Sequence, residues 1–250
     1  MRYFVTFSYL GTDFHGSQTQ PHGQTVQSVM EEAFATILRV PTPLTFAGRT
    51  DAGVHAEMMV AHFDSLTPIP TNLGPRLNSL LPATIAIRDI RRVTDDAHAR
   101  FDAIERTYRY RITTRKDPFC YHTRTRIASS LDFDAINDAA NHLLGTQDFN
   151  SFCRTHTDVK TTICTVTDAR WIVENEYESY FSISANRFLR NMVRAIVGTL
   201  FEVGRGRMTE DEFADVINAH DRRNAGHSAP AEGLALVDIK YPNHITNHED

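Results

Sequence analysis

The sequence predicts an α+β protein of two similar halves, each a ferredoxin-like antiparallel sheet with helices on one face. Apolar residues alternate with a period of two in some segments and recur at helical spacing in others. The order strand, helix, strand pair, helix, strand can be followed twice along the chain. We expect one half to span residues 1–103 and the other residues 104–250. A chain of 250 residues is long enough to build such cores without disulfides or metals.

The first half opens on a strand, because apolar side chains from Tyr3 to Tyr9 alternate with polar ones. From residue 26 to 38 the apolar residues follow the i, i+3, i+4, i+7 spacing of an amphipathic helix, which Pro41 would end. The same patterns predict the remaining elements of this half: short strands over 44–47 and 57–63, a helix over 73–81 and a strand over 83–93.

The second half begins with a strand over 106–113, on which Tyr108 and Tyr110 share one face and Arg109 and Arg111 the other. A capping box of Thr209 and Glu212 marks the start of a late helix. The other expected elements are a helix over 136–144, a hairpin of strands 161–173 and 177–185 turning at residue 175, a helix over 187–203 and a last strand over 234–239.

Composition excludes several classes of protein. Charged residues make up 23% of the chain and hydrophobic residues 41%, the ordinary globular balance. No stretch approaches the roughly 18 apolar residues of a membrane span, and the N-terminus alternates where a signal peptide would be continuously apolar. We therefore expect no membrane association and a cytoplasmic protein.

Cysteine and glycine spacing point away from metals and cofactors. The three cysteines have no C-x-x-C spacing and are expected as small core residues, and the twelve histidines form no H-E-x-x-H motif. There is neither a P-loop nor a G-x-G-x-x-G motif. The sequence thus predicts no metal site and no small-molecule cofactor.

The formal charge of −5 hides a basic region. Residues 88–126 contain eleven Arg and Lys against six Asp and Glu, and 23 of the 26 basic residues in the chain are arginine. Residues 187–207 add five arginines against one glutamate. Arginine suits bidentate phosphate contacts and stacking on bases. Runs of charged residues also occur on solvated surfaces without a binding role, and that alternative stays open.

One string is unusual: residues 47–55 read AGRTDAGVH. Two glycines flank Arg49 and Asp51 at the end of an expected strand, where a tight backbone can present a carboxylate to a ligand. On local chemistry alone, the same residues fit a surface turn in which Asp51 caps the next element and Arg49 is solvated.

This string resembles the signature of the tRNA pseudouridine synthase A family, in which the aspartate is the catalytic carboxylate. Other segments resemble the family in order and spacing over nearly the whole chain: HARFDAIERTYRYRI at 98–112, ANRFLRNMVRAIVG at 185–198 and PAEGLALV at 230–237. The resemblance assigns substrate contact to Tyr108 and places Arg194 beside Asp51. One departure is Ser17, in Gly16-Ser17-Gln18, where the family often has tryptophan before the glutamine.

The resemblance implies the pseudouridine synthase fold, with a catalytic cleft between two ferredoxin-like halves. It also implies a homodimer that binds one tRNA across both subunits and isomerises uridines at about positions 38 to 40, in the anticodon arm, without a cofactor. The target base must leave its stack before reaction, at a cost of a few kcal/mol. Arg49 would then fill the vacated space or hold the phosphate of the flipped nucleotide.

Residue chemistry leaves the route open. Asp51 could attack C1′ of the ribose or C6 of the base, or act as a base at C2′. We expect Arg194 to keep Asp51 ionised and to point into a cleft, and Tyr108 to stack on the detached uracil near the C5 proton. Without the resemblance, Tyr108 reads as a core tyrosine, and Arg187, Arg190 and Arg194 as the solvated face of one helix.

Two other functions compete. A non-catalytic RNA-binding module could use Tyr108 and Tyr110 for stacking, although R-T-Y-R-Y-R-I lacks the glycine and phenylalanine of the RNP1 motif. A metal-dependent hydrolase using the histidines is the weaker alternative.

Overall fold

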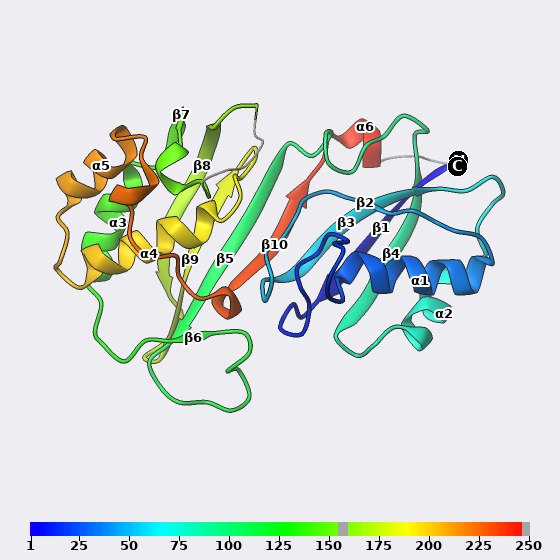
Figure 1. Ribbon diagram of the computed structural model, residues 1–250, viewed down its shortest axis with the longest axis horizontal. Coiled ribbons are helices and arrows are strands. Elements are labelled where there is room, and N and C mark those ends of the chain that lie inside the picture. Colours follow the sequence, from blue (N-terminus) through cyan, green and yellow to red (C-terminus); the bar gives the residue numbers. More distant parts are fainter. Residues whose placement is uncertain (155–159, 247–250) are drawn as a thin grey trace. The chain divides into compact units, whose positions relative to one another are not determined.

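The computed structural model describes residues 1–154 and 160–246 and divides the chain into two compact units (Figure 1). Unit 1 comprises Met1–Glu105 and the chain from Leu236 onward, and unit 2 comprises Arg106–Ala235. Both units combine helices with antiparallel strands, so the predicted α+β class is confirmed.

The sheet of unit 1 is built around β1 (Arg2–Tyr9). Strands β3 (His55–Asp64) and β4 (Ile85–Val93) flank β1, both antiparallel to it, and the short β2 (Thr45–Phe46) pairs with β3. The resulting order β4-β1-β3-β2 is that of a ferredoxin-like βαββαβ unit. Phe4 is also buried, so β1 buries part of both faces rather than the one face that alternation suggests.

Two helices complete the βαββαβ order of unit 1, at the predicted places. Helix α1 (Val26–Leu38) begins with a capping box formed by Thr25 and Ser28. Its apolar stripe is buried at Val26, Met30, Ala33 and Phe34. Helix α2 (Leu73–Leu80) packs near α1 and against β4 (Figure 1).

The sheet of unit 2 contains β5 (Glu105–Thr113), β9 (Glu178–Ala185), β8 (Ile163–Val173) and β7 (Gly145–Asp148), in that order and antiparallel. Strand β6 (Thr125–Arg126) runs parallel to the end of β5. The predicted hairpin is confirmed, and Asn175 closes it by accepting hydrogen bonds from the backbone N–H groups of Tyr177 and Glu178. Strand β7 was not predicted.

Helices α3 (Phe133–Asn141), α4 (Met192–Gly204) and α5 (Glu210–Asn218) pack together in unit 2. The capping box of Thr209 and Glu212 is confirmed. The helix predicted over 187–203 is too long at its start, because Asn191 takes a left-handed φ of 66° that a continuing helix cannot contain. Arg187 and Arg190 therefore do not share a helical face with Arg194.

The remaining elements are the 3₁₀ turns η1 (Asn150–Phe152), η2 (Arg222–Asn224) and η3 (Ala231–Gly233), the sheet strand β10 (Leu234–Lys240) and the short helix α6 (Asn243–Thr246). β10 begins in unit 2 and continues in unit 1, where it neighbours β3. The units thus divide at residue 105 rather than 103, and the closing segment that was expected in the second half is shared.

The three cysteines are buried, as expected of core residues. Across the described part of the chain, no helix is long and apolar enough to cross a bilayer.

Candidate active site

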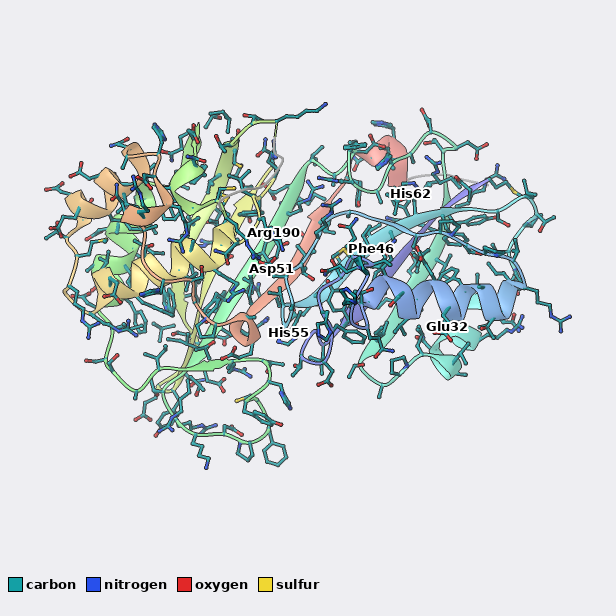
Figure 2. The ribbon with its side chains drawn as sticks, in the orientation of Figure 1. Glu32, Phe46, Asp51, His55, His62 and Arg190 are labelled. Atoms are coloured by element: carbon teal, nitrogen blue, oxygen red, sulfur yellow. The ribbon has the colours of Figure 1, made fainter. Side chains whose placement is uncertain are left out.

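The segment between β2 and β3 presents Arg49 and Asp51 to solvent. Arg49 is exposed and Asp51 partly exposed, whereas Thr50 between them is buried. The chain then turns tightly: Gly53 has a φ of +78°, and the backbone N–H of Val54 donates to the Asp51 carbonyl at 3.1 Å. Figure 2 labels Asp51 and His55 at the two ends of this turn.

The buried Thr50 fixes this segment to the interior of unit 1. Its backbone N–H donates to Ser17 Oγ at 2.8 Å, and its carbonyl accepts from the Ser17 N–H at 3.2 Å. Its hydroxyl pairs with the Tyr9 hydroxyl at 2.9 Å, inside the protein. Buried hydrogen bonds of this kind are costly to break, so they hold Thr50 inward and its two neighbours outward.

The far end of the turn is held by His55. Its Nδ1 accepts from the backbone N–H of Gly11 at 2.8 Å, and the ring is buried. A Cβ on Gly11 would lie 2.0 Å from the Val54 carbonyl oxygen, so only glycine permits this approach. His55 is thus a hydrogen-bonded structural histidine at this site. No group of three His, Cys, Asp or Glu side chains in residues 1–154 and 160–246 is arranged to hold a metal ion.

The loop that follows β1 connects this segment to helix α1. Gly16 has a φ of +90°, and its carbonyl accepts from the N–H of Val26, the first residue of α1. The Ser17 carbonyl accepts from the N–H of Gln27 at 3.0 Å. Ser17 is only 1% exposed, so the residue that departs from the family pattern lies inside unit 1.

Sequence reasoning missed the roles of Thr50, Ser17 and Tyr9 at this site. Alternation along β1 does place Tyr9 on the buried face. No local pattern marks Ser17 as the partner of Thr50, which is 33 residues away.

Tyr108 lies on β5 of unit 2 and is buried, with its ring edge-on to Phe188 at 5.1 Å between centroids. Tyr110 lies two residues further on the same face and is fully buried, with its hydroxyl 2.7 Å from Thr125 Oγ1. Burial raises the pKa of Tyr110 far above its usual value. Tyr110 is therefore a core tyrosine, whereas Tyr108 contacts the partly exposed Phe188.

Arg194 is partly exposed in the first turn of α4. Its Nε donates to the Ala229 carbonyl at 2.7 Å, and the Ala229 N–H donates back to the Arg194 carbonyl at 2.9 Å. The Nε bond holds the side chain without using the two Nη groups, whose N–H donors suit a phosphate or carboxylate.

The segment around Ala229 lies very close to α4. A Cβ on Gly198 would lie 1.7 Å from the His227 carbonyl oxygen, so the approach needs a glycine. Asn191 ties the start of α4 to the same segment by donating from Nδ2 to Ser228 Oγ at 2.7 Å. The start of α4, residues 192–194, and the segment around Ala229 are thus packed together inside unit 2.

Each unit carries two of the four predicted site residues, with Arg49 and Asp51 in unit 1 and Tyr108 and Arg194 in unit 2. Within unit 1, Arg49 and Asp51 lie on one anchored segment. Within unit 2, Arg194 contributes to the electrostatic environment of Tyr110, the buried neighbour of Tyr108 on β5.

Comparison with known proteins gives a consistent result. A family model described as tRNA pseudouridine synthase matches residues 139–242. The tRNA pseudouridine synthase A of Parabacteroides distasonis is 51% identical over 251 residues, covering 100% of this chain and 99% of the relative. The protein of the same name from Bacillus subtilis is 40% identical over 248 residues, covering 97% of this chain and 100% of the relative.

Proposed function

We propose that Asp51 is the catalytic carboxylate of this chain, which belongs to the tRNA pseudouridine synthase A family and is an isomerase that converts uridine to pseudouridine in tRNA. Family membership decides against the non-catalytic RNA-binding module and the hydrolase. The observation that supports Asp51 is its partly exposed position on a segment whose neighbour, Thr50, is buried and held at three polar atoms. A carboxylate held this way is preorganised for a ligand that arrives from solvent.

One carboxylate is sufficient for the reaction. The bond from C1′ to N1 breaks, a bond from C1′ to C5 forms, C5 loses its proton and N1 gains one. Asp51 could act as a nucleophile at C1′ or C6, or as a base at C2′. Each route needs a carboxyl group that the substrate can reach, which the partly exposed Asp51 supplies. The isomerisation transfers no electrons, and we propose that it proceeds without a cofactor.

Tyr108, Arg194 and Arg49 complete the proposed site. Tyr108 would contact the uracil while it is detached, since an aromatic ring stacks on any base. Arg194 would supply positive charge that favours the ionised form of Asp51. Arg49 is exposed and two residues from Asp51, so it would bind a phosphate of the flipped nucleotide or occupy the space that the base leaves.

The family resemblance also supports narrower proposals. They are modification at about positions 38 to 40 of the anticodon arm, a homodimer and a cytoplasmic location. Mapping the pseudouridines in treated tRNA tests the first proposal, and sedimentation equilibrium tests the second.

The catalytic assignment is tested with Asp51→Asn, which preserves shape and removes the charge. Release of tritium from C5-labelled uridine in tRNA should fall by about 10³-fold or more, because a group that forms bonds to the substrate is lost. Binding of tRNA should stay within a few-fold. Asp89→Asn is the control, because Asp89 is an exposed carboxylate on β4 of the same unit. Tritium release at the wild-type rate by purified Asp51→Asn would contradict the assignment.

A further inference from the structure

We infer that the side-chain hydroxyl of Ser17 is a positioning group for Asp51, an inference that rests on the proposed catalytic role of Asp51. Ser17 is 1% exposed, so in this structure it cannot touch a bound RNA. It acts on the site through the backbone of Thr50, the residue between Arg49 and Asp51.

Ser17 holds the peptide groups on both sides of Thr50. Its Oγ accepts from the Thr50 N–H at 2.8 Å, which fixes the peptide that joins Arg49 to Thr50. Its own N–H donates to the Thr50 carbonyl at 3.2 Å, which fixes the peptide that joins Thr50 to Asp51. Rotation of either peptide would change φ or ψ of Thr50 and move the backbone that carries the Asp51 side chain, so the two bonds together fix the point from which that side chain leaves the backbone.

Ser17 is itself held by regular structure. Its carbonyl accepts from the N–H of Gln27 in the first turn of the 13-residue helix α1. Gly16 beside it has a φ of +90°, and a Cβ there would lie 2.9 Å from the Thr50 carbonyl oxygen. The loop therefore lies tightly against Thr50 at Gly16 and is hydrogen-bonded to helix α1 at Ser17. Ser17 thus connects α1 to the backbone that precedes Asp51.

The Ser17 hydroxyl provides a hydrogen-bond acceptor that the backbone of Ser17 does not replace. In Ser17→Ala the bond to the Thr50 carbonyl can persist, but the Thr50 N–H loses its acceptor inside the protein. A buried N–H without a partner is unfavourable, so this peptide will turn toward another acceptor or admit water. A displacement of about 1 Å at a reacting group costs about 100-fold in rate.

The test measures single-turnover tritium release from C5-labelled tRNA at saturating enzyme, together with tRNA affinity and the temperature of unfolding. We expect Ser17→Ala to slow the reaction by about 10- to 100-fold, while the Kd for tRNA changes less than about 2-fold. Ser17→Cys, whose sulfur is a weaker acceptor, should fall between serine and alanine.

Ser151→Ala is the matched control. Ser151 is also fully buried, and its Oγ accepts from a backbone N–H, that of Asp221, at 2.9 Å in unit 2. The substitution removes the same kind of bond away from the Asp51 segment. It should lower the unfolding temperature about as much as Ser17→Ala and leave the single-turnover rate within about 2-fold.

Two results would overturn the inference: a wild-type rate for Ser17→Ala, or an equal loss of rate in Ser151→Ala at equal loss of stability. If Ser17→Ala does not fold, Ser17→Cys takes its place under the same criteria. Asp51→Asn is assayed in parallel. If Asp51→Asn is active, the proposed function of Asp51 fails; if it is inactive and Ser17→Ala reacts normally, only the role of Ser17 fails.

Discussion

Unit 1 holds two of its irregular segments with histidine rings, in addition to the Ser17 hydroxyl, whereas unit 2 holds two of its own with hydroxyl groups. In unit 1, Nδ1 of His62 accepts from the Ala99 N–H at 3.1 Å, as Nδ1 of His55 does from Gly11. In unit 2, hydroxyl groups have this role: Thr199 Oγ1 accepts from the Gly226 N–H at 2.9 Å, and Ser151 Oγ from that of Asp221. A hydroxyl accepts at any ordinary pH, whereas a ring nitrogen stops accepting once it is protonated.

The second difference is where the close backbone approaches lie. Unit 2 brings the carbonyl of His227 against Gly198 within a helix, whereas in unit 1 the close approach is that of Gly11, outside a helix, to the Val54 carbonyl. Unit 1 also fastens the Asp51 segment through side-chain hydroxyls, those of Tyr9, Ser17 and Thr50. The comparison indicates that acid should loosen unit 1 first, that a methyl group at Gly198 should disturb the packing of α4 in unit 2, and that loss of one hydroxyl should act on the Asp51 segment.

Acidification tests the first difference and has the largest expected effect. Burial, with a further contribution from Arg2, lowers the pKa of His62 from 6.5 to about 4. As pH falls, the unfolded chain therefore binds this proton before the folded one does. The stability that His62 contributes is complete above pH 6.5 and is lost toward pH 4, by up to about 3 kcal/mol. Urea unfolding across this range, with hydrogen exchange at Ala99 and Gly226, measures the loss in each unit.

Variants separate this histidine from the other acid-titrating groups. His62→Gln (Figure 2 labels His62) keeps a neutral acceptor, so stability should fall less steeply between pH 6.5 and 4. His122→Gln, at an exposed loop position, should keep the wild-type slope. Equal slopes in all three proteins would show that His62 is not the source of the acid sensitivity of unit 1.

Gly198→Ala tests the close approach in unit 2. The added Cβ would meet the His227 carbonyl oxygen at 1.7 Å, so the segment that holds Arg194 must move away. We expect a loss of about 2–3 kcal/mol in the free energy of unfolding. Gly74→Ala in α2 is the control, since its Cβ would meet nothing closer than 3.8 Å and alanine favours a helix. A neutral Gly198→Ala would mean that this backbone contact is not essential.

Tyr9→Phe tests the hydroxyl anchor of unit 1 and has the smallest expected effect. It removes the bond to Thr50 Oγ1 and should cost about 1 kcal/mol of stability. Tyr3→Phe is the control on the same strand, because the Tyr3 hydroxyl has only a 3.8 Å contact with the Met1 sulfur. If chemical denaturation gives equal losses of unfolding free energy for the two variants, the Tyr9 hydroxyl does not help to hold the Asp51 segment.

Most secondary structure follows from local patterns in the sequence. The stripe of α1, the Thr209 and Glu212 capping box and the Asn175 turn are all where periodicity and cap chemistry place them, since each depends on residues within a few positions. The start of α4 was misplaced because an apolar pattern continues through Asn191, and only the backbone geometry there shows where the helix begins.

The sequence by itself determined the α+β class, the order of the longer strands and helices, and the string that carries Arg49 and Asp51, because periodicity and a glycine-flanked motif are local properties. Only the tertiary structure decided that Thr50 is the buried anchor, that Ser17 is its partner and that His55 and His62 accept backbone hydrogen bonds. These contacts join residues 33 to 44 positions apart, and no local pattern specifies which distant group will satisfy a buried N–H.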